Sequence, residues 1–228
     1  MKFIVTGCTG FIGSEVLNQC LRNPSITSIV ALSRRLLPDT ISNNPKLQII
    51  VKKDFNSYSD DDIKVLSGAD ACIWCMGTTA GDKVLEIDYP LAFGNAFSRT
   101  LAESQKKFRY LHLSGGMTER DQSKPLWFAG NMRKLKGQAE VNMLSFAEKE
   151  ETEGFWETVI VKAPFVIKKD ITSPRDAFGW MMGNKRCIQV DELAAAMMDV
   201  AVNGSKDITL SDAEALVALG RAALEKVK

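Results

Sequence analysis

Histidine is almost absent from this sequence of 228 residues, in which His112 is the only one. A single histidine excludes most of the ligand sets that hold zinc in proteins. Long apolar runs are also absent: none reaches the roughly 18 residues that a membrane span needs. The first short run, Phe3–Val5, meets glycine soon afterwards and does not resemble the core of a signal peptide. We therefore expect a cytosolic protein with no membrane span.

The sequence also lacks an excess of charge of either sign. Its 29 lysines and arginines balance 28 aspartates and glutamates, for a net charge of +1. Partners such as nucleic acid or an anionic membrane usually require a marked basic excess. We therefore expect neither, and the hydrophobic fraction of 45% is that of an ordinary globular protein.

Cysteine is present, but in a pattern that is poor for disulfides. The five cysteines are an odd number with scattered spacing: Cys8, Cys20, Cys72, Cys75 and Cys187. Cys72 and Cys75 form a C-x-x-C pair inside an apolar segment that reads as a buried strand. Residues three apart in a strand point to opposite faces, and no second Cys/His pair exists. We therefore expect neither a metal site nor a dithiol.

Short apolar segments alternate with longer amphipathic ones along the first three quarters of the chain. The predicted strands are 2–6, 28–33, 47–52, 71–76, 110–114 and 158–162, and the predicted helices are 11–21, 60–66, 89–106 and 131–150. Nearly continuous apolar strands separated by helices indicate a parallel sheet covered on both faces. Because such crossovers are right-handed, we predict a doubly wound α/β fold. The absence of repeats and of low-complexity linkers indicates one domain, 1–228.

The alternation breaks after Pro164. Residues 165–183 contain Pro174, Gly179 and mixed charges, and a helix is predicted over 191–202. We expect a small C-terminal insertion near 165–190 at the carboxyl edge of the sheet, as a candidate substrate cap. A last helix is predicted over 211–228, with Ser211 as its N-cap and Glu214 completing a capping box.

Three glycines stand directly between the first predicted strand and the first helix. Gly7, Gly10 and Gly13 form G-x-x-G-x-x-G within Val5-Thr6-Gly7-Cys8-Thr9-Gly10-Phe11-Ile12-Gly13. In a Rossmann dinucleotide site such glycines make the tight turn, admit the pyrophosphate and allow close helix packing. The helix N-terminus adds free N–H groups and partial positive charge. The segment therefore predicts a cofactor pyrophosphate bound by Gly7, Thr9, Gly10, Phe11, Ile12 and Gly13.

The end of the second predicted strand indicates which dinucleotide is bound. An NAD site usually has Asp or Glu at this position, to bind the ribose hydroxyls. This sequence has Ser33, Arg34 and Arg35 instead. Guanidinium groups suit a 2′-phosphate, so NADP(H) is the predicted cofactor. Asp54, just past the third strand, is expected to meet the adenine amino group.

Several motifs together resemble the extended and atypical short-chain dehydrogenase/reductases. They are the glycine segment, Leu32-Ser33-Arg34-Arg35, Cys75-Met76-Gly77-Thr78-Thr79, Ile87-Asp88-Tyr89, Leu113-Ser114, Lys136-Gly137-Gln138-Ala139-Glu140 and Ala163-Pro164. The set is similar to the HIV Tat-interacting-protein oxidoreductase branch, which includes fungal mitochondrial proteins. This resemblance implies that Gly77 and Thr78 lie beside the nicotinamide half of the cofactor. In that family a helix pair corresponding to 89–106 and 131–150 commonly forms a homodimer.

The resemblance also implies a catalytic set with one member missing. These enzymes use a Ser, a Tyr and a Lys, the last two spaced as Y-x-x-x-K, and the Tyr passes a proton to or from the substrate oxygen. Ser114 matches the Ser and Lys136 matches both the catalytic and the ribose-binding Lys, but the Tyr position is Met132. The tyrosines are Tyr58, Tyr89 and Tyr110, so no shift of register can supply a phenol.

Three functions remain open at this point. The first is an NADP(H)-dependent oxidoreductase acting on a small, largely apolar molecule with a different proton donor. The second is a non-redox reaction such as a cyclisation or isomerisation, and the third is an NADP(H)-binding sensor without turnover. Candidate residues of an apolar substrate site are Trp127, Phe128, Met132, Phe178, Trp180, Met181 and Met182.

Overall fold

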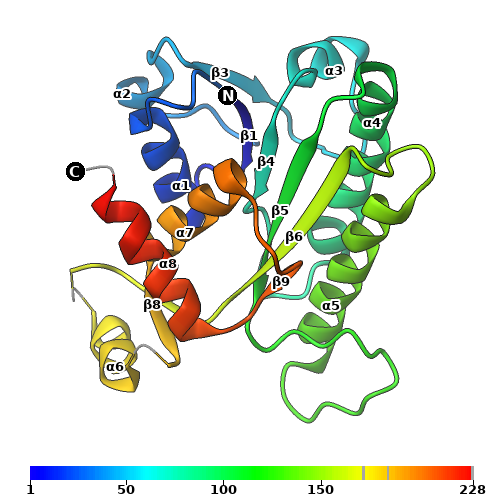
Figure 1. The fold of residues 1–228 in the computed structure, drawn as a ribbon. Coiled ribbons are helices and arrows are strands. Elements are labelled where there is room, and N and C mark those ends of the chain that lie inside the picture. Colours follow the sequence, from blue (N-terminus) through cyan, green and yellow to red (C-terminus); the bar gives the residue numbers. More distant parts are fainter. Residues whose placement is uncertain (171–172, 184, 227–228) are drawn as a thin grey trace.

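A computed structural model describes residues 1–170, 173–183 and 185–226. At its centre is a parallel seven-stranded sheet in the order β3-β2-β1-β4-β5-β6-β9 (Figure 1). The strands are β1 (Lys2–Thr6), β2 (Ser28–Ser33), β3 (Leu47–Val51), β4 (Ala71–Trp74), β5 (Phe108–Gly115), β6 (Trp156–Ala163) and β9 (Thr209–Leu210). The two halves of the sheet are wound in opposite directions from β1 and β4. The predicted doubly wound Rossmann fold is confirmed.

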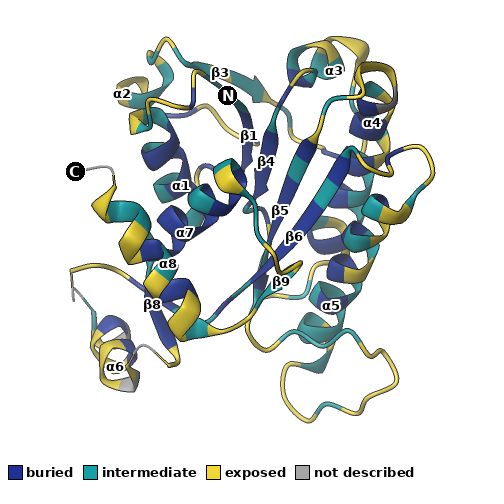
Figure 2. Cartoon of the chain, viewed as in Figure 1, coloured by how far each residue is buried: buried dark blue, intermediate teal, exposed yellow. Residues whose placement is uncertain are grey.

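Helices cover both faces of the sheet, as Figure 1 shows. One layer contains α1 (Phe11–Arg22), α7 (Val190–Asn203) and α8 (Ala213–Glu225). The other contains α3 (Asp60–Leu66), α4 (Tyr89–Ser104) and α5 (Gly130–Leu144), while the short α2 (Asp39–Ser42) precedes β3. Each layer buries its own apolar cluster against the sheet, and Figure 2 shows the strands buried between them. This two-sided burial explains the nearly continuous apolar strands of the sequence.

The second cluster is rich in aromatic rings. Trp74, Phe93, Phe97, Tyr110 and Trp156 lie between β4, β5, β6 and α4 and contact one another. Rings of this size supply a large share of the apolar area that a domain buries. These ring contacts pack α4 against β4, β5 and β6.

Some element boundaries differ from those predicted. The predicted helix 131–150 ends as an α-helix at Leu144 and continues as a 3-10 turn, η2 (Ser145–Glu148). The expected Ser211 N-cap of the last helix is wrong: Asp212 is the N-cap, and its carboxylate accepts the Ala215 N–H at 2.8 Å. Serine and aspartate are both good N-caps, so the residue type alone does not distinguish Ser211 from Asp212. The position at which the helix begins decides which of the two is the N-cap, and α8 packs along α7.

A small second unit follows β6. Strands β7 (Phe165–Ile167) and β8 (Cys187–Gln189) form a parallel pair, and α6 (Pro174–Met182) packs on β7. The contact needs a glycine, because a Cβ atom on Gly179 would lie 2.4 Å from the Ile167 side chain. Figure 1 shows α6 and the long segment 116–129 at the edge where the central strands end. Within the described residues, no helix is long and apolar enough to cross a membrane.

Candidate functional site

The glycine segment forms a turn that side chains would block. Gly7 has a φ of +69°, and a Cβ atom on it would lie 2.6 Å from the Cys75 carbonyl oxygen. The Gly10 N–H donates to the Gly7 carbonyl at 2.8 Å, and a Cβ atom on Gly13 would lie 2.3 Å from that same oxygen. Glycine is therefore required at both positions, for backbone conformation at Gly7 and for close packing at Gly13.

The turn opens directly onto the N-terminus of α1. Thr9 and Gly10 are exposed, Phe11 is exposed in the first turn, and Ile12 packs against the core. The first turn of α1 contains no acidic residue, and Gly10, as the N-cap, offers no side-chain acceptor. The first N–H groups of the helix are thus available to an anion from outside the chain.

The end of β2 lies next to this turn and presents two cations. Ser33 is buried; its hydroxyl donates to the Arg35 carbonyl at 2.7 Å and accepts the Arg35 N–H at 3.2 Å. This local hydrogen bonding fixes the chain as it leaves the strand. Arg34 and Arg35 are exposed, and neither guanidinium has an ion-pair partner in the described part of the chain. Asp54 is exposed after β3 and accepts the Asn56 N–H at 3.0 Å.

The carboxyl end of β4 joins the glycine turn to helix α5. The Thr6 hydroxyl accepts the N–H groups of Cys75 and Met76 at 3.1 and 3.2 Å, so the chain beyond β4 is fastened to β1. The next residue, Gly77, lies against the Lys136 ammonium: a Cβ atom on Gly77 would be 3.2 Å from Lys136 Nζ. The structure thus brings together Gly77, Thr78 and Lys136, the three residues that the family resemblance implied for the nicotinamide half.

Lys136 also has a partner that the sequence did not indicate. Its Nζ lies 2.8 and 2.9 Å from the two carboxylate oxygens of Glu86, which is only 2% exposed. The same carboxylate accepts the Thr78 N–H at 2.6 Å. Glu86 lies in a π-helical turn, η1 (Val84–Asp88), immediately before α4.

Met132 occupies the position at which the resembled enzymes have their phenol. It lies in the first turn of α5 against the segment that follows Thr78: a Cβ atom on Gly81 would be 3.5 Å from the Met132 Cβ. Met132 therefore lies one helical turn before Lys136 and against the chain that follows Thr78. A thioether is only a weak acceptor and has no proton to donate, so Met132 cannot act as the phenol does.

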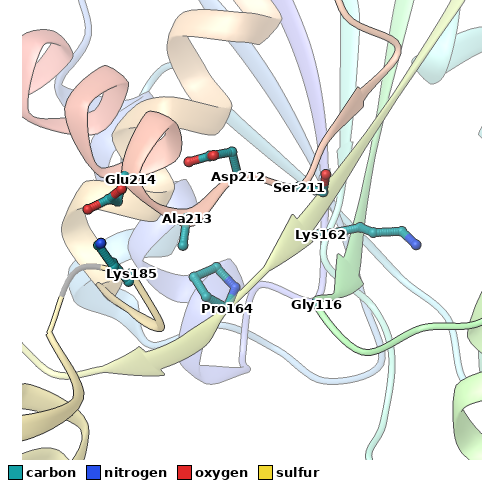
Figure 3. A pocket seen from close by; sticks show the side chains of 8 residues that line it. All are labelled: Gly116, Lys162, Pro164, Lys185, Ser211, Asp212, Ala213 and Glu214. Carbon is teal, nitrogen blue, oxygen red and sulfur yellow. The ribbon is translucent and has the colours of Figure 1, made fainter.

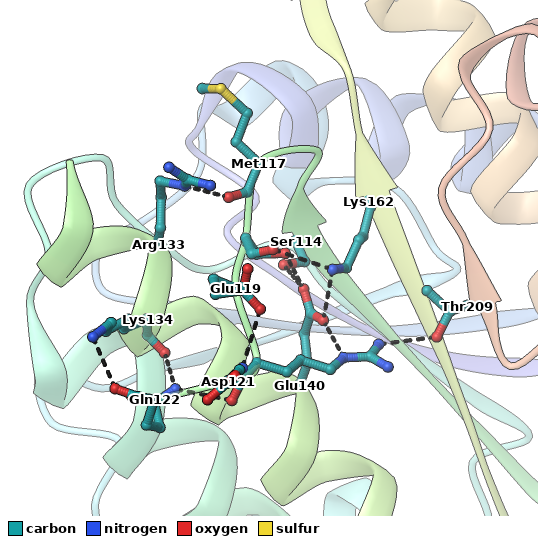
Figure 4. A network of polar contacts seen from close by, with 12 residues as sticks. Ser114, Met117, Glu119, Asp121, Gln122, Arg133, Lys134, Glu140, Lys162 and Thr209 are labelled. Atoms are coloured by element: carbon teal, nitrogen blue, oxygen red, sulfur yellow. Dashed lines mark hydrogen bonds and ion pairs between the residues drawn. The ribbon is translucent and has the colours of Figure 1, made fainter. Parts of the chain in front are cut away.

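Ser114, the remaining member of the expected set, is held by a different carboxylate. Its hydroxyl donates to Glu140 at 2.5 Å, and Thr118 donates to the same oxygen at 2.5 Å. Figure 4 shows Lys162 also directed at Glu140, whose ion-pair partners are Arg120 at 2.6 Å and Lys162 at 3.2 Å. No hydrogen bond joins Ser114 to Lys136 in the ranges that the structure describes.

Two cations and two hydroxyls compensate the burial of Glu140. Its side chain has no exposed surface. Burial acts to raise the pKa of Glu140, but hydrogen bonds from Ser114, Thr118 and Arg120 and the charge of Lys162 outweigh it, so the pKa lies below its ordinary value. The carboxylate stays ionised, and the hydroxyl proton of Ser114 is engaged by it.

Sequence reasoning missed both Glu86 and Glu140 as site residues. Glu140 follows Lys136 by four residues, so the two lie on one face of α5, one helical turn apart. This spacing is present in the sequence and could have indicated Glu140 as a neighbour of the site. Glu86 had no such indication, because the π-helical turn that directs it inward interrupts any regular periodicity.

A pocket of about 420 Å³ lies beside this network, where β6 ends. Its lining residues are Gly116, Lys162, Pro164, Lys185, Ser211, Asp212, Ala213 and Glu214 (Figure 3). In that view the Lys162 side chain points away from Pro164 and Asp212, toward Glu140 as its ion pair requires. The charged residues that line it are Lys162, Lys185, Asp212 and Glu214, so its wall contains both signs of charge.

The cysteine thiols, all within the described residues, form no disulfide, and Cys75 enters the site only through its backbone. Cys8, Cys20, Cys72, Cys75 and Cys187 are all free. Burial raises the pKa of Cys72 and of Cys75 well above the ordinary value, which disfavours the reactive thiolate. In the described residues, no group of three or more His, Cys, Asp or Glu side chains is arranged to hold a metal ion.

Curated relatives match only parts of the chain, and no family model matches it. Leucinostatins biosynthesis cluster protein T of Purpureocillium lilacinum is 32% identical over 50% of this chain and 42% of its own length. Protein FMP52, mitochondrial, of Candida albicans is 26% identical over 71% of this chain and 66% of its own length. The matched segment thus spans less than two thirds of each relative. Because one relative is named as mitochondrial, the expected cytosolic location stays a prediction.

Solved structures match nearly the whole chain. A dTDP-glucose 4,6-dehydratase from Streptomyces venezuelae, with NAD bound, covers 99% of this chain with 81% of its own, at a TM-score of 0.64 and 14% identity. A short-chain dehydrogenase/reductase from Saccharomyces cerevisiae covers 96% with 98% of its own, at a TM-score of 0.66 and 12% identity. Identities this low carry the fold alone. The chain has the Rossmann fold that short-chain dehydrogenases/reductases also have.

Proposed function

We propose that this protein binds NADP(H) across the carboxyl ends of β1, β2 and β4. The observation that carries the proposal is the direct contact between the glycine turn and the end of β4, through Gly7 and Cys75. This contact places the end of β4, and with it Gly77, close to the glycine turn, which supports a single site that extends from the N-terminus of α1 to Thr78 and Lys136. A dinucleotide needs two such ends, one for its pyrophosphate and one for its nicotinamide ribose.

The residues at the adenosine end fit the group. Gly7, Thr9, Gly10, Phe11, Ile12 and Gly13 surround the pyrophosphate, which receives N–H groups from α1. Arg34 and Arg35, whose guanidinium groups have no ion-pair partner among the described residues, bind the 2′-phosphate, and the Ser33 hydroxyl fixes the backbone of the turn that carries them. Asp54 lies beside the adenine.

We further propose an oxidoreductase activity toward a small, largely apolar substrate. The bound cofactor supplies or accepts a hydride. Lys136 binds the nicotinamide ribose and holds the proton that a phenol at position 132 would otherwise donate. Substrates that need little acid assistance, such as activated alkenes or iminium ions, suit this arrangement.

Exposed apolar side chains at the same edge support the apolar substrate class. Trp127 is 96% exposed and lies beside Phe128 in the segment 116–129, and Trp180 is 67% exposed on α6 with Phe178 and Met181. Figure 2 shows these two regions as largely exposed. In the proposal the 165–190 unit and the segment 116–129 act as substrate caps. The expected candidate Met182 is placed on α6, and its side chain lies outside the description.

A second candidate function is cofactor binding without turnover. It is supported by Ser114, whose hydroxyl donates to Glu140 and so is not available to a substrate carbonyl. With Met132 at the phenol position, two of the three expected groups cannot act in the usual way.

The test is a titration of the wild-type protein with NADPH and NADH, followed by tryptophan fluorescence. In the Arg34→Ala and Arg35→Ala variants we expect NADPH affinity to fall roughly 10- to 100-fold, the value of a charge-assisted contact, and NADH affinity to change less than about 2-fold. Arg99→Ala, an exposed arginine on α4, is the matched control. Equal losses for both cofactors would contradict the 2′-phosphate assignment, and no binding of either would overturn the proposal.

Turnover is then tested by following nicotinamide absorbance with apolar enals, iminium ions and ketones. Substrate-dependent NADPH oxidation that is lost in Lys136→Met supports the oxidoreductase. Tight NADPH binding with no oxidation across the panel supports the binding-only candidate. The homodimer that the family resemblance implies, through α4 and α5, is tested separately by sedimentation.

A further inference from the structure

The carboxylate of Glu86 is buried by an irregular piece of backbone. η1 (Val84–Asp88) is a π-helical turn, wider than an α-helical turn by one residue, and such turns are frequent at functional sites. The other acidic residues of this region serve locally: Asp82 accepts the N–H groups of Val84 and Leu85, and Asp88 pairs with Lys83. Glu86 alone of the three is directed inward.

Three parts of the proposed nicotinamide end meet at this carboxylate. It accepts the Thr78 N–H at 2.6 Å and two contacts from Lys136 Nζ at 2.8 and 2.9 Å. A Cβ atom on Gly77 would lie 3.3 Å from both of its oxygens. Glu86 therefore fastens the chain beyond β4 to helix α5 at one point.

A buried ion pair of this kind is a poor way to stabilise a fold. Removing two charges from water costs as much as their attraction returns, and apolar pairs of the same size often do better. Glu86 is 2% exposed and the Lys136 side chain 14% exposed, so both are largely desolvated. Their position beside Gly77 and Thr78 is consistent with a task at the site.

The contacts also leave Lys136 able to act. An ammonium has three N–H donors, and the two contacts with Glu86 engage at most two of them. At least one donor remains for a ribose hydroxyl. Among the described residues, Glu86 is the only acceptor of hydrogen bonds from this ammonium, so Glu86 sets the direction of the Lys136 side chain.

We propose that Glu86 is a positioning residue for the nicotinamide-ribose half of the cofactor. It orients the Lys136 ammonium and holds the Thr78 backbone, and it touches neither the adenine nor the phosphates. This inference rests on the proposed function, that is, on NADP(H) binding. It adds a residue that no sequence motif indicated, and it assigns that residue to one half of the ligand.

The test compares two ligands by calorimetry: NADPH, and adenosine 2′,5′-bisphosphate, which contains the adenosine end but no nicotinamide. In Glu86→Gln we expect NADPH to bind about 10-fold more weakly and the bisphosphate to change less than about 2-fold. Glu86→Asp, which keeps the charge on a shorter side chain, should lie between the wild type and Glu86→Gln. Asp88→Asn, in the same turn, is the matched control and should leave both affinities unchanged.

A double-mutant cycle tests whether Glu86 acts through Lys136. Glu86→Gln with Lys136→Met should weaken NADPH binding no more than the weaker-binding single variant, because the second change removes a contact already lost. Additive losses would overturn the inference, as would equal losses for NADPH and the bisphosphate. If the wild type binds the bisphosphate and NADPH while Glu86→Gln and Glu86→Asp leave both affinities unchanged, Glu86 has no positioning role and the proposed function stands. If the wild type binds neither ligand, both fail.

Discussion

The two ends of the proposed cofactor site differ in what forms them: mainly backbone at one end and charged side chains at the other. At the adenosine end, the backbone of Gly7, Gly10 and Gly13 makes the turn, and β2 ends nearby in two arginines whose guanidinium groups have no ion-pair partner in the described part of the chain. At the nicotinamide end, charged side chains hold one another: Glu86 with Lys136, and Glu140 with the Ser114 hydroxyl. The first end has the glycine turn that is typical of dinucleotide sites. At the second, Met132 stands at the position where the resembled enzymes have a phenol, and Glu86 and Glu140 form buried ion pairs.

The difference teaches that the two ends respond to different constraints. A pyrophosphate cradle depends on the absence of side chains, so few sequences can form it and the motif is distinctive. The other end depends on contacts between charged side chains that are distant in the sequence, Glu86 with Lys136 and Glu140 with Ser114. Its arrangement is therefore set by how whole elements pack and not by a local motif.

The largest effect should come from the backbone-built end. Gly13→Ala places a methyl group 2.3 Å from the Gly7 carbonyl oxygen, so the turn must move. We expect NADPH affinity to fall more than about 100-fold and the free energy of unfolding to fall by about 3 kcal/mol. Calorimetry and urea unfolding measure the two effects. Ser14→Ala, in the same helical turn, should change neither by much; equal behaviour of the two variants would contradict the close packing.

Removing the charge of Glu140 should distinguish its role from that of Glu86 at the nicotinamide end. Glu140→Gln leaves Arg120 and Lys162 without their buried counter-charge, so we expect the free energy of unfolding to fall by about 3 kcal/mol. NADPH affinity should stay within about 3-fold of wild type, since Glu140 acts on Ser114 rather than on Lys136. A large loss of affinity at unchanged stability would assign Glu140 to the cofactor site instead.

Lowering the pH should reduce the free energy of unfolding, because of the buried His112 on β5. Burial, with a contribution from the charge of Lys136 and against that of Glu140, lowers the pKa of His112 to about 4 in the folded protein. The unfolded chain therefore takes up a proton below pH 6.5 that the folded protein refuses, and stability is lost as the pH falls. Between pH 7 and pH 5 this amounts to about 2 kcal/mol.

The measurement is the free energy of unfolding at several pH values in that window. In His112→Gln the slope should flatten, because no other histidine is present. Glu140, whose pKa is lowered, loses its stabilising charge at more acid pH, below its ordinary value of 4.5. An unchanged slope in His112→Gln would show that another group titrates.

The smallest change in stability is expected at Met132. Met132 is only partly buried, so Met132→Tyr should alter the free energy of unfolding by less than about 0.5 kcal/mol. It restores a phenol beside Lys136, but the Ser114 proton remains engaged by Glu140. We therefore expect only a weak gain of ketone reduction, roughly 10-fold or less over wild type. A large gain would show that Ser114 is free to act, and would bring this end closer to the resembled enzymes.

Much of the fold could be predicted from the sequence because its elements are locally encoded. The apolar strands, the amphipathic helix that begins at Phe11 and the break after Pro164 all correspond to elements of the structure. Boundaries were less certain where two neighbours can serve equally well, as at Ser211 and Asp212. Among site residues, the family resemblance implied that Gly77, Thr78 and Lys136 all serve the nicotinamide half of the cofactor, and the structure places the Lys136 ammonium against Gly77.

What the sequence alone determined is the adenosine end of the proposed site: glycines at three positions, a helix that begins after them, and two arginines at the end of the next strand. Each follows from local rules of conformation and charge. Only the tertiary structure decided what surrounds Lys136 and Ser114. Glu86 lies 50 residues before Lys136 in the chain, and a π-helical turn directs it inward; Glu140 meets Ser114 across 26 residues. Contacts between distant side chains depend on how whole elements pack, and no local pattern in the sequence specifies them.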